Sequence, residues 1–90
     1  MQKTLTSAEY ARLIGLLVAA REKAGIRQRA LAEALNVPQS FVAKYEGGER
    51  RIDVIEFIAI TRALGADPVK LFRDYVAGKA APTSVKPVSK

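Results

Sequence analysis

The chain opens with apolar residues at helical spacing. From Tyr10 to Val18, tyrosine, leucine, isoleucine and valine recur three or four residues apart, which places them on one face of a helix. Thr6 and Glu9 have the spacing of a capping box and predict where this helix starts. Gly25 predicts its end, because glycine readily adopts the left-handed conformation that follows a helix.

Two shorter helices follow, separated by a sharp break. The first is predicted over Gln28–Leu35 and the second over Gln39–Glu46. The break is Asn36-Val37-Pro38, where asparagine tolerates the left-handed conformation and proline suits a helix start better than a helix interior. Two helices joined by so short a segment form a helix-turn-helix, whose second helix can enter the major groove of DNA.

Two more helices are expected after the loop that begins at Gly47. Asp53 and Glu56 predict a capping box for the fourth, and Asp67-Pro68 has the residue types that open the fifth. The inner face of the fourth helix is expected to contain Ile55, Ile58, Ala59 and Leu64. That of the second helix is expected to contain Ala30, Leu31, Ala32, Ala34 and Leu35. The whole pattern predicts an all-α fold, five short helices around one core.

The pattern also divides the chain into three parts: an N-terminal arm (residues 1–6), a helical domain (7–77) and a tail (78–90) that is expected to be flexible and basic. Ninety residues suffice for one small domain. The N-terminus lacks the apolar core of a secretion signal, and the longest apolar run is far below the roughly 20 residues that span a bilayer. We therefore expect a cytoplasmic protein with no membrane partner.

Histidine and cysteine are both missing from the sequence. Their absence excludes disulfides and thiolate metal sites, and it removes the commonest general base and the commonest transition-metal ligand. The acidic side chains are scattered among arginines, and no glycine-rich phosphate loop follows a strand. We therefore expect no enzymatic activity, no catalytic residue, no metal and no cofactor.

The net charge of +6 at pH 7 favours a polyanionic partner. Residues 21–51 hold seven basic against four acidic side chains, and residues 78–90 add three lysines. A basic tail can simply be solvated. The excess over residues 21–51, which contain the expected helix-turn-helix, is therefore the better indication of nucleic-acid binding.

The predicted helix Gln39–Glu46 has two faces. Val42 and Tyr45, three residues apart, are expected to face the core. The other face presents side chains suited to a DNA groove: Gln39, Ser40, Ala43 and Lys44. Glutamine can bond adenine with two hydrogen bonds, lysine and serine can reach bases or phosphates, and alanine allows close approach. A short helix can also be polar only because it is solvated. Phe41 is expected either to contact a thymine methyl or to lie at the rim of the core.

An ordered set of residues extends this interpretation: Arg21, Gly25, Gln28, Leu31-Ala32, Leu35, Val37, Ser40, Val42, Glu46, Gly48, Ala63-Leu64-Gly65 and Leu71-Phe72. In order and spacing, the segment from residue 17 to residue 75 resembles the lambda-repressor-like DNA-binding family, also called the Cro/repressor or xenobiotic-response-element (XRE) type. The resemblance implies a compact five-helix domain with the helix-turn-helix at its second and third helices. Asn36, Pro38, Arg27 and Phe41 depart from the usual residues of the family, which leaves the base preference open.

The resemblance also implies roles for single residues. The positions that read bases correspond to Gln39, Ser40 and Lys44, with Phe41 and Ala43 beside them. The candidate phosphate contacts are Gln28, Arg27, Arg29, Arg50 and Arg51. Gln28 opens a helix, where exposed amides suit a phosphate, although it could be an ordinary first-turn residue. The arginines at 50 and 51 could equally be solvated. Arg21 and Glu46 correspond to a partly buried structural ion pair.

Together these observations predict a sequence-specific transcriptional regulator, a repressor that binds a palindromic double-stranded DNA operator as a homodimer. The candidate dimer surface is the apolar set Val69, Phe72 and Val76. The alternative is a protein-interaction module, such as the antitoxin of a toxin–antitoxin pair, in which DNA binding is secondary. An interaction module does not need exposed groove-reading side chains beside arginines, so that face distinguishes the two hypotheses.

Overall fold

The computed structural model describes residues 7–79 and 81 of the 90-residue chain. It contains five helices: α1 (Ser7–Ala24), α2 (Gln28–Leu35), α3 (Gln39–Glu46), α4 (Val54–Ala63) and α5 (Pro68–Val76). The described residues include no strand, and the all-α fold expected from the sequence is confirmed. The predicted arm, the capping role of Thr6 and most of the predicted tail lie outside the described residues.

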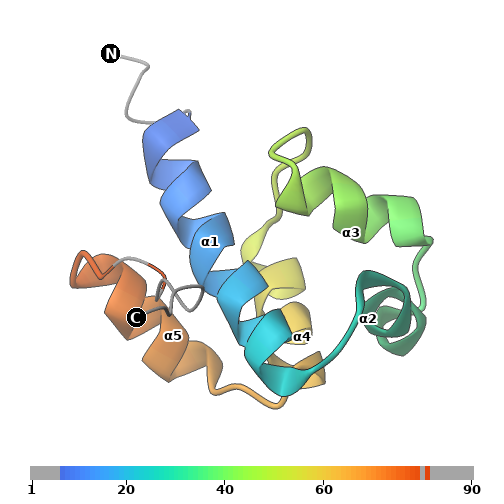
Figure 1. Cartoon of the computed structure of the whole chain (residues 1–90). Coiled ribbons are helices and arrows are strands. Elements are labelled where there is room, and N and C mark those ends of the chain that lie inside the picture. The colour runs from blue at the N-terminus through green and yellow to red at the C-terminus, as the bar shows by residue number, and fades with distance from the viewer. Residues whose placement is uncertain (1–6, 80, 82–90) are drawn as a thin grey trace, which may run out of the picture.

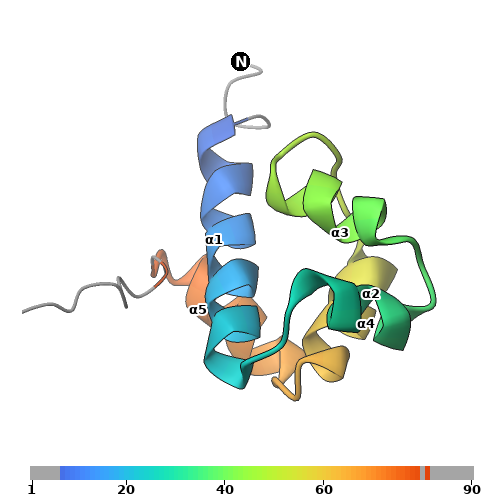
Figure 2. The same ribbon diagram turned by 45° about the vertical axis from the view of Figure 1, so that its right-hand side comes forward.

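The long helix α1 separates two groups of shorter helices (Figure 1). The α2–α3 pair packs on one side of it, with α3 against α1, and α5 packs on the other. Helix α4 contacts both α2 and α5 and so connects the two sides, as the turned view in Figure 2 also indicates. The helix-turn-helix is therefore held from behind by α1 and α4.

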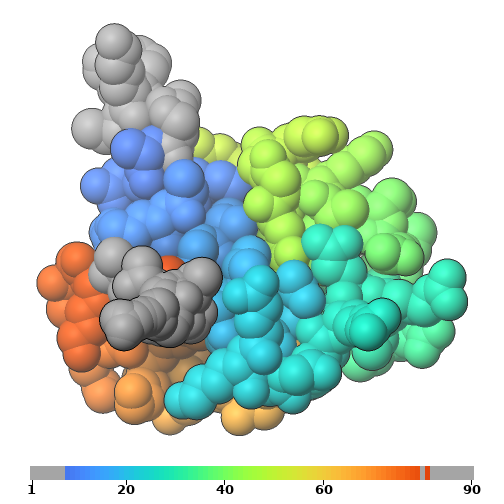
Figure 3. Space-filling view, in the orientation of Figure 1, coloured from blue at the N-terminus to red at the C-terminus, as the bar shows by residue number. Residues whose placement is uncertain are grey.

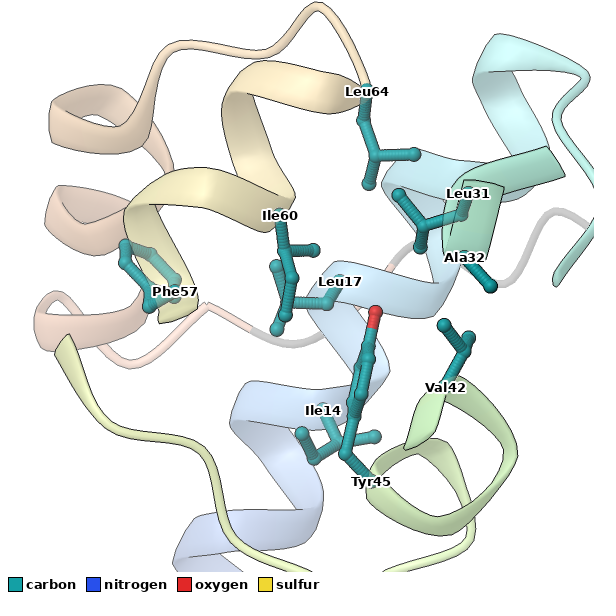
Figure 4. Close-up of a cluster of buried hydrophobic side chains, with 9 residues drawn as sticks. All are labelled: Ile14, Leu17, Leu31, Ala32, Val42, Tyr45, Phe57, Ile60 and Leu64. Carbon is teal, nitrogen blue, oxygen red and sulfur yellow. The ribbon is translucent and has the colours of Figure 1, made fainter. Parts of the chain in front are cut away.

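The core lies where α1, α2, α3 and α4 meet (Figure 4). Its buried residues are Ile14, Leu17, Leu31, Ala32, Val42, Tyr45, Phe57, Ile60 and Leu64. None of the residues of α5 is fully buried, and Leu71 is the member of that helix that packs partly buried against the core. The helix-turn-helix thus contributes to the centre of the core, whereas α5 lies at its edge.

The predicted inner face of α4 is partly wrong. Ile55 is 78% exposed and Ala59 is also exposed, whereas Phe57, Ile60 and Thr61 are buried. The start of α4 reads Val-Ile-Glu-Phe-Ile-Ala-Ile, so apolar residues occupy nearly every position and their spacing does not select one face. The packing of α4 against α2 and α5 selects it instead.

Two alanines of α2 were also assigned to the wrong face. Ala30 and Ala34 are exposed, while Leu31 and Ala32 are buried and Leu35 is partly buried. Alanine has a small side chain and the highest helix propensity, so it is tolerated on either face of a helix. Leu31 and Ala32, with Leu35 beside them, form the face of α2 that packs against the core.

The helix ends are set by local hydrogen bonds of one type. Gly25 and Asn36 both have positive φ, 72° and 59°, and the next residue donates its N–H to a carbonyl five residues back. These bonds join Ile26 to Arg21 (3.2 Å) and Val37 to Ala32 (3.0 Å). They are Schellman motifs, as predicted from glycine and asparagine at these positions. Both apolar residues after the turn pack against the core, which fixes the exits of α1 and α2.

Candidate nucleic-acid interface

Helix α3 is buried on one face and open on the other. Val42 and Tyr45 are 0% exposed, so they anchor the helix in the core. The other face carries exposed side chains: Gln39, Ser40, Ala43 and Lys44. In the space-filling view, α3 (green) forms an outer edge of the molecule beside α1 (Figure 3). The helix is therefore fixed from within, while a row of polar and small side chains remains accessible.

Phe41 lies between these two faces. It is partly buried, packs against the core, and its ring meets that of Tyr45 edge-on with centroids 5.9 Å apart. This is the rim position, one of the two expectations for Phe41. The aromatic contact ties the first turn of α3 to the buried tyrosine in its last turn.

The helices of the helix-turn-helix start differently from the helices behind them. The N-caps of α4 and α5 are Asp53 and Asp67, whose carboxylates accept bonds from the backbone N–H groups of Glu56 and Val69. Those of α2 and α3 are Arg27 and Pro38, and neither side chain makes a capping bond within the described part of the chain. The first amides of α2 and α3 therefore keep donors that an anion can use.

The structure brings Arg21, Glu46 and Gln28 into one network. The guanidinium of Arg21 donates to the carboxylate of Glu46 twice, Nε to Oε2 at 2.7 Å and Nη2 to Oε1 at 3.0 Å. A third donor bond, from Nη1, goes to the carbonyl of Ile26 at 2.9 Å. The bond to Glu46 is the main reason that the pKa of Arg21 is raised. The network joins the end of α1 to the end of α3.

Gln28 belongs to this network, a contact that the sequence argument did not anticipate. Its Nε2 donates to Oε1 of Glu46 at 2.8 Å, and its side chain is half-buried. One amide N–H therefore serves the ion pair, and the second can serve another acceptor. Arg27 and Arg29 on either side are exposed. The start of α2 thus combines an anchored glutamine with two accessible guanidinium groups.

Arg50 and Arg51, both candidate phosphate contacts, have different surroundings. Arg50 folds back onto Glu56, with bonds of 3.1 Å and 3.0 Å to the two carboxylate oxygens. Its guanidinium carbon also lies 4.4 Å from the centroid of the Phe41 ring. Arg51 is exposed, with its guanidinium carbon 4.8 Å from the ring centroid of Tyr10.

A cluster of contacts around Arg12 was not predicted from the sequence. Its Nη1 donates to the carbonyls of Tyr75 (2.9 Å) and Lys79 (3.1 Å), and its guanidinium lies over the Tyr75 ring at 4.4 Å. Arg12 thus caps the end of α5 from α1, where a positive charge is favourable. The partners are separated by 63 residues or more, so no local pattern could have revealed the contact. Lys79 belongs to the segment predicted as tail, and its contact with Arg12 holds the start of that segment against α1.

The described residues contain no group of three or more histidine, cysteine, aspartate or glutamate side chains able to hold a metal ion. In the same part of the chain, no helix has the length and apolar character needed to cross a membrane.

Comparisons with known proteins agree with this geometry. A helix-turn-helix family model matches residues 17–71, more than half of the chain. A solved XRE-family like protein from Pseudomonas syringae pv. tomato str. DC3000 has 49% sequence identity and a TM-score of 0.79, and the match covers 84% of this chain and 93% of that one.

A second solved structure, the clp gene regulator ClgR from C. glutamicum, has a TM-score of 0.70 over 83% of this chain and 96% of that one. Its 23% identity supports the fold alone. No curated protein matches the sequence. The family model and the Pseudomonas structure are sufficient to conclude that this chain belongs to the XRE-type helix-turn-helix family of DNA-binding transcription regulators.

Proposed function

We propose that the protein is a sequence-specific repressor that reads the DNA major groove with α3 and binds its operator as a homodimer. The observation that carries the proposal is the exposed row Gln39, Ser40 and Lys44 on a helix whose opposite face is buried. A groove-reading helix needs this combination, because its side chains must reach base edges while its backbone stays fixed.

The groups at the start of α2 that could bind phosphate support the proposal that α3 enters the groove. The uncapped amides of α2 and α3 and the exposed Arg27 and Arg29 can bind the backbone on either side of the groove. Arg51 is exposed in the loop after α3 and is the candidate contact at the other end of the site. Such contacts fix the register of the protein on DNA, and Gln39 and Lys44 then select the bases.

The apolar surface of α5 supports the homodimer. Val69, Phe72 and Val76 are 64%, 52% and 67% exposed, an unusual concentration for a nine-residue helix. A single domain reaches only a few base pairs, and a symmetric pair binds two half-sites about one helical turn apart. Repression follows from occupancy, because a domain that fills the groove excludes other proteins from the same DNA.

The test is selection from a pool of random duplexes, followed by fluorescence anisotropy at two salt concentrations. Wild type is compared with the double variant Gln39→Ala/Lys44→Ala. The control is Lys70→Ala, which also removes one lysine charge but from α5, away from α3. We expect a palindrome to be enriched by wild type and by the control, and lost in the double variant while weak salt-sensitive binding remains.

The opposite outcome is equally clear. If wild type enriches no sequence and binds every duplex weakly with the same salt dependence, the proposed repressor function is wrong. The interaction-module hypothesis, with an antitoxin as its example, then becomes the better explanation, and the exposed apolar residues of α5 become the surface to test for a protein partner.

A further inference from the structure

We propose that Arg50 is a positioning residue, which holds α3 in its base-reading orientation through Glu56 and Phe41 and does not contact the DNA backbone. The inference rests on the proposed function, since it concerns how α3 is presented to DNA. It assigns different roles to two neighbouring arginines, Arg50 and Arg51, that the sequence alone treats alike.

Three of the five N–H donors of the Arg50 guanidinium bind acceptors of the protein. Nη1 donates to Oε1 of Glu56 (3.1 Å) and to the carbonyl of Arg51 (2.8 Å), and Nη2 donates to Oε2 of Glu56 (3.0 Å). The two bonds to Glu56 form the bidentate arrangement that only a planar guanidinium can make. A phosphate would have to displace this carboxylate before it could take the same donors.

The face of the guanidinium is occupied as well. Its central carbon lies 4.4 Å from the centroid of the Phe41 ring, within the range of a cation–π contact. Phe41 belongs to the first turns of α3, directly after the groove-facing Ser40 and close to Gln39. In the proposed role, the contact of Arg50 with the Phe41 ring holds the backbone of this turn, and with it the positions from which Gln39 and Ser40 extend.

Glu56 connects this contact to the rigid part of the molecule. Its Oε1 also accepts the backbone N–H of Asp53 at 2.9 Å, which completes the capping box of α4, and the next residue, Phe57, is buried in the core. On the other side, the hydroxyl of Tyr10 in α1 donates to the carbonyl of Arg50 at 2.7 Å. The first turn of α3 is thus braced against both α4 and α1.

The charges around Arg50 favour the same role. The hydrogen bond to Arg50 is the main reason that the pKa of Glu56 lies below its usual value. A paired arginine adds little net attraction for phosphate. Arg51 makes no ion pair among the described residues and is exposed, so its charge remains accessible to DNA.

Two variants separate positioning from phosphate binding. Arg50→Lys keeps the charge but loses the bidentate geometry, and Glu56→Gln removes a negative charge while weakening the same contact. The probes are the duplex that wild type enriches from a random pool and a scrambled duplex of the same composition. For Arg50→Lys we expect about tenfold weaker binding to the enriched duplex, roughly the value of one base contact, and unchanged binding to the scrambled one. Glu56→Gln also adds one net positive charge, so for this variant we expect a similar fall in the ratio of the affinities for the enriched and the scrambled duplex.

A phosphate contact gives the opposite pattern and would overturn the proposal. Arg50→Lys would then retain its affinity, and Glu56→Gln would bind both duplexes more tightly by the same factor, because a repulsive charge is gone while the ratio of the two affinities is kept. Arg50→Gln would lower the salt-dependence slope by about 0.9 under phosphate binding and leave it unchanged under positioning. Asp53→Asn is the control: it removes a charge from the same capping box and keeps a capping oxygen, so discrimination between the two duplexes should persist.

Amide hydrogen exchange in the free protein tests the brace without DNA. In Arg50→Lys we expect faster exchange across α3 and unchanged exchange in the middle of α1. Equal exchange in α3 of wild type and variant would overturn the inference whether or not a duplex is enriched. If wild type enriches none, the proposed function fails, and the exchange experiment reports separately on the brace.

Discussion

The carboxylate of Glu46 accepts two hydrogen bonds from the guanidinium of Arg21, at 2.7 Å and 3.0 Å, and joins the end of α3 to the end of α1. The two side chains are only 7% and 13% exposed. Glu46→Ala should therefore destabilise the protein by on the order of 3 kcal/mol, because it leaves the arginine charge poorly solvated and unpaired. Urea denaturation followed by circular dichroism measures the loss.

Glu49→Ala is the matched control, since Glu49 is exposed in the following turn and should cost less than about 0.5 kcal/mol. If both variants unfold at the same urea concentration as wild type, the ion pair is not a stabilising contact.

The hydroxyl of Tyr45 is buried and has no hydrogen-bond partner among the described residues. Figure 4 shows it pointing into the apolar centre of the core. An unpaired buried hydroxyl carries a desolvation cost, so Tyr45→Phe should raise the free energy of unfolding by about 1 kcal/mol. Thermal and urea denaturation both measure it. A destabilised variant would mean that the hydroxyl has a partner, such as a bound water.

The same residue predicts a pH dependence. Burial raises the pKa of Tyr45 above that of a tyrosine in an unfolded chain, which is about 10. The folded state then holds the proton more tightly, so stability is complete below about pH 10 and is lost as the pH rises further. We expect a smaller loss of stability above about pH 10 in Tyr45→Phe than in wild type. Tyr10, whose pKa burial also raises, accounts for part of the remaining loss.

Gly15 lies inside α1, where glycine is an unfavourable residue. A Cβ atom built there meets the Cβ of Ala81 at 3.6 Å, an ordinary van der Waals contact. Gly15→Ala should therefore stabilise the protein by about 0.5–1 kcal/mol through helix propensity alone. Urea denaturation of wild type, Gly15→Ala and the larger Gly15→Leu compares their free energies of unfolding. A loss of stability in the alanine variant would show that α1 and residue 81 pack more closely than this distance implies.

The proposed homodimer predicts that charged substitutions on the exposed apolar surface of α5 prevent dimerisation. Val69→Asp/Val76→Asp places two charges on its exposed apolar surface and should leave the monomer folded, because both side chains are more than 60% exposed. We expect the variant to be monomeric by light scattering at concentrations where wild type is dimeric. Val54→Asp changes a similarly exposed valine on α4 and should remain dimeric. A wild type that is monomeric both with and without DNA would contradict the proposed dimer.

The sequence predicted the helix boundaries well because local rules determine them. Asn36 and Pro38 end one helix and begin the next through their own backbone preferences, and Asp53 and Glu56 form the expected capping box. The buried face of α3 could also be predicted, since Val42 and Tyr45 lie three residues apart and therefore share one face of the helix. These features need information from only a few adjacent residues.

The rest of the site depends on contacts between distant segments. Arg12 meets the carbonyl of Tyr75 across 63 positions, and Gln28 meets Glu46 across 18. From the sequence, Arg50 was a candidate phosphate contact that could equally be solvated. The helix that contains Glu56 begins just after it and supplies a carboxylate at hydrogen-bonding distance, 3.0 Å. The pattern of charges along a sequence does not indicate which arginine forms an ion pair, because the packing of the helices determines which carboxylate lies near it.

The contrast between the helix starts has a thermodynamic consequence. Asp53 and Asp67 complete the ends of α4 and α5 in the free protein, whereas the side chains of Arg27 and Pro38 make no such bond for α2 and α3 in the described structure. An anion bound at either of those two ends supplies bonds that folding by itself does not make. Its binding energy then adds to the free energy of unfolding, so the melting temperature rises with ligand occupancy. Folding and the binding of a polyanion are therefore coupled equilibria in this protein, and a change in either one shifts the other.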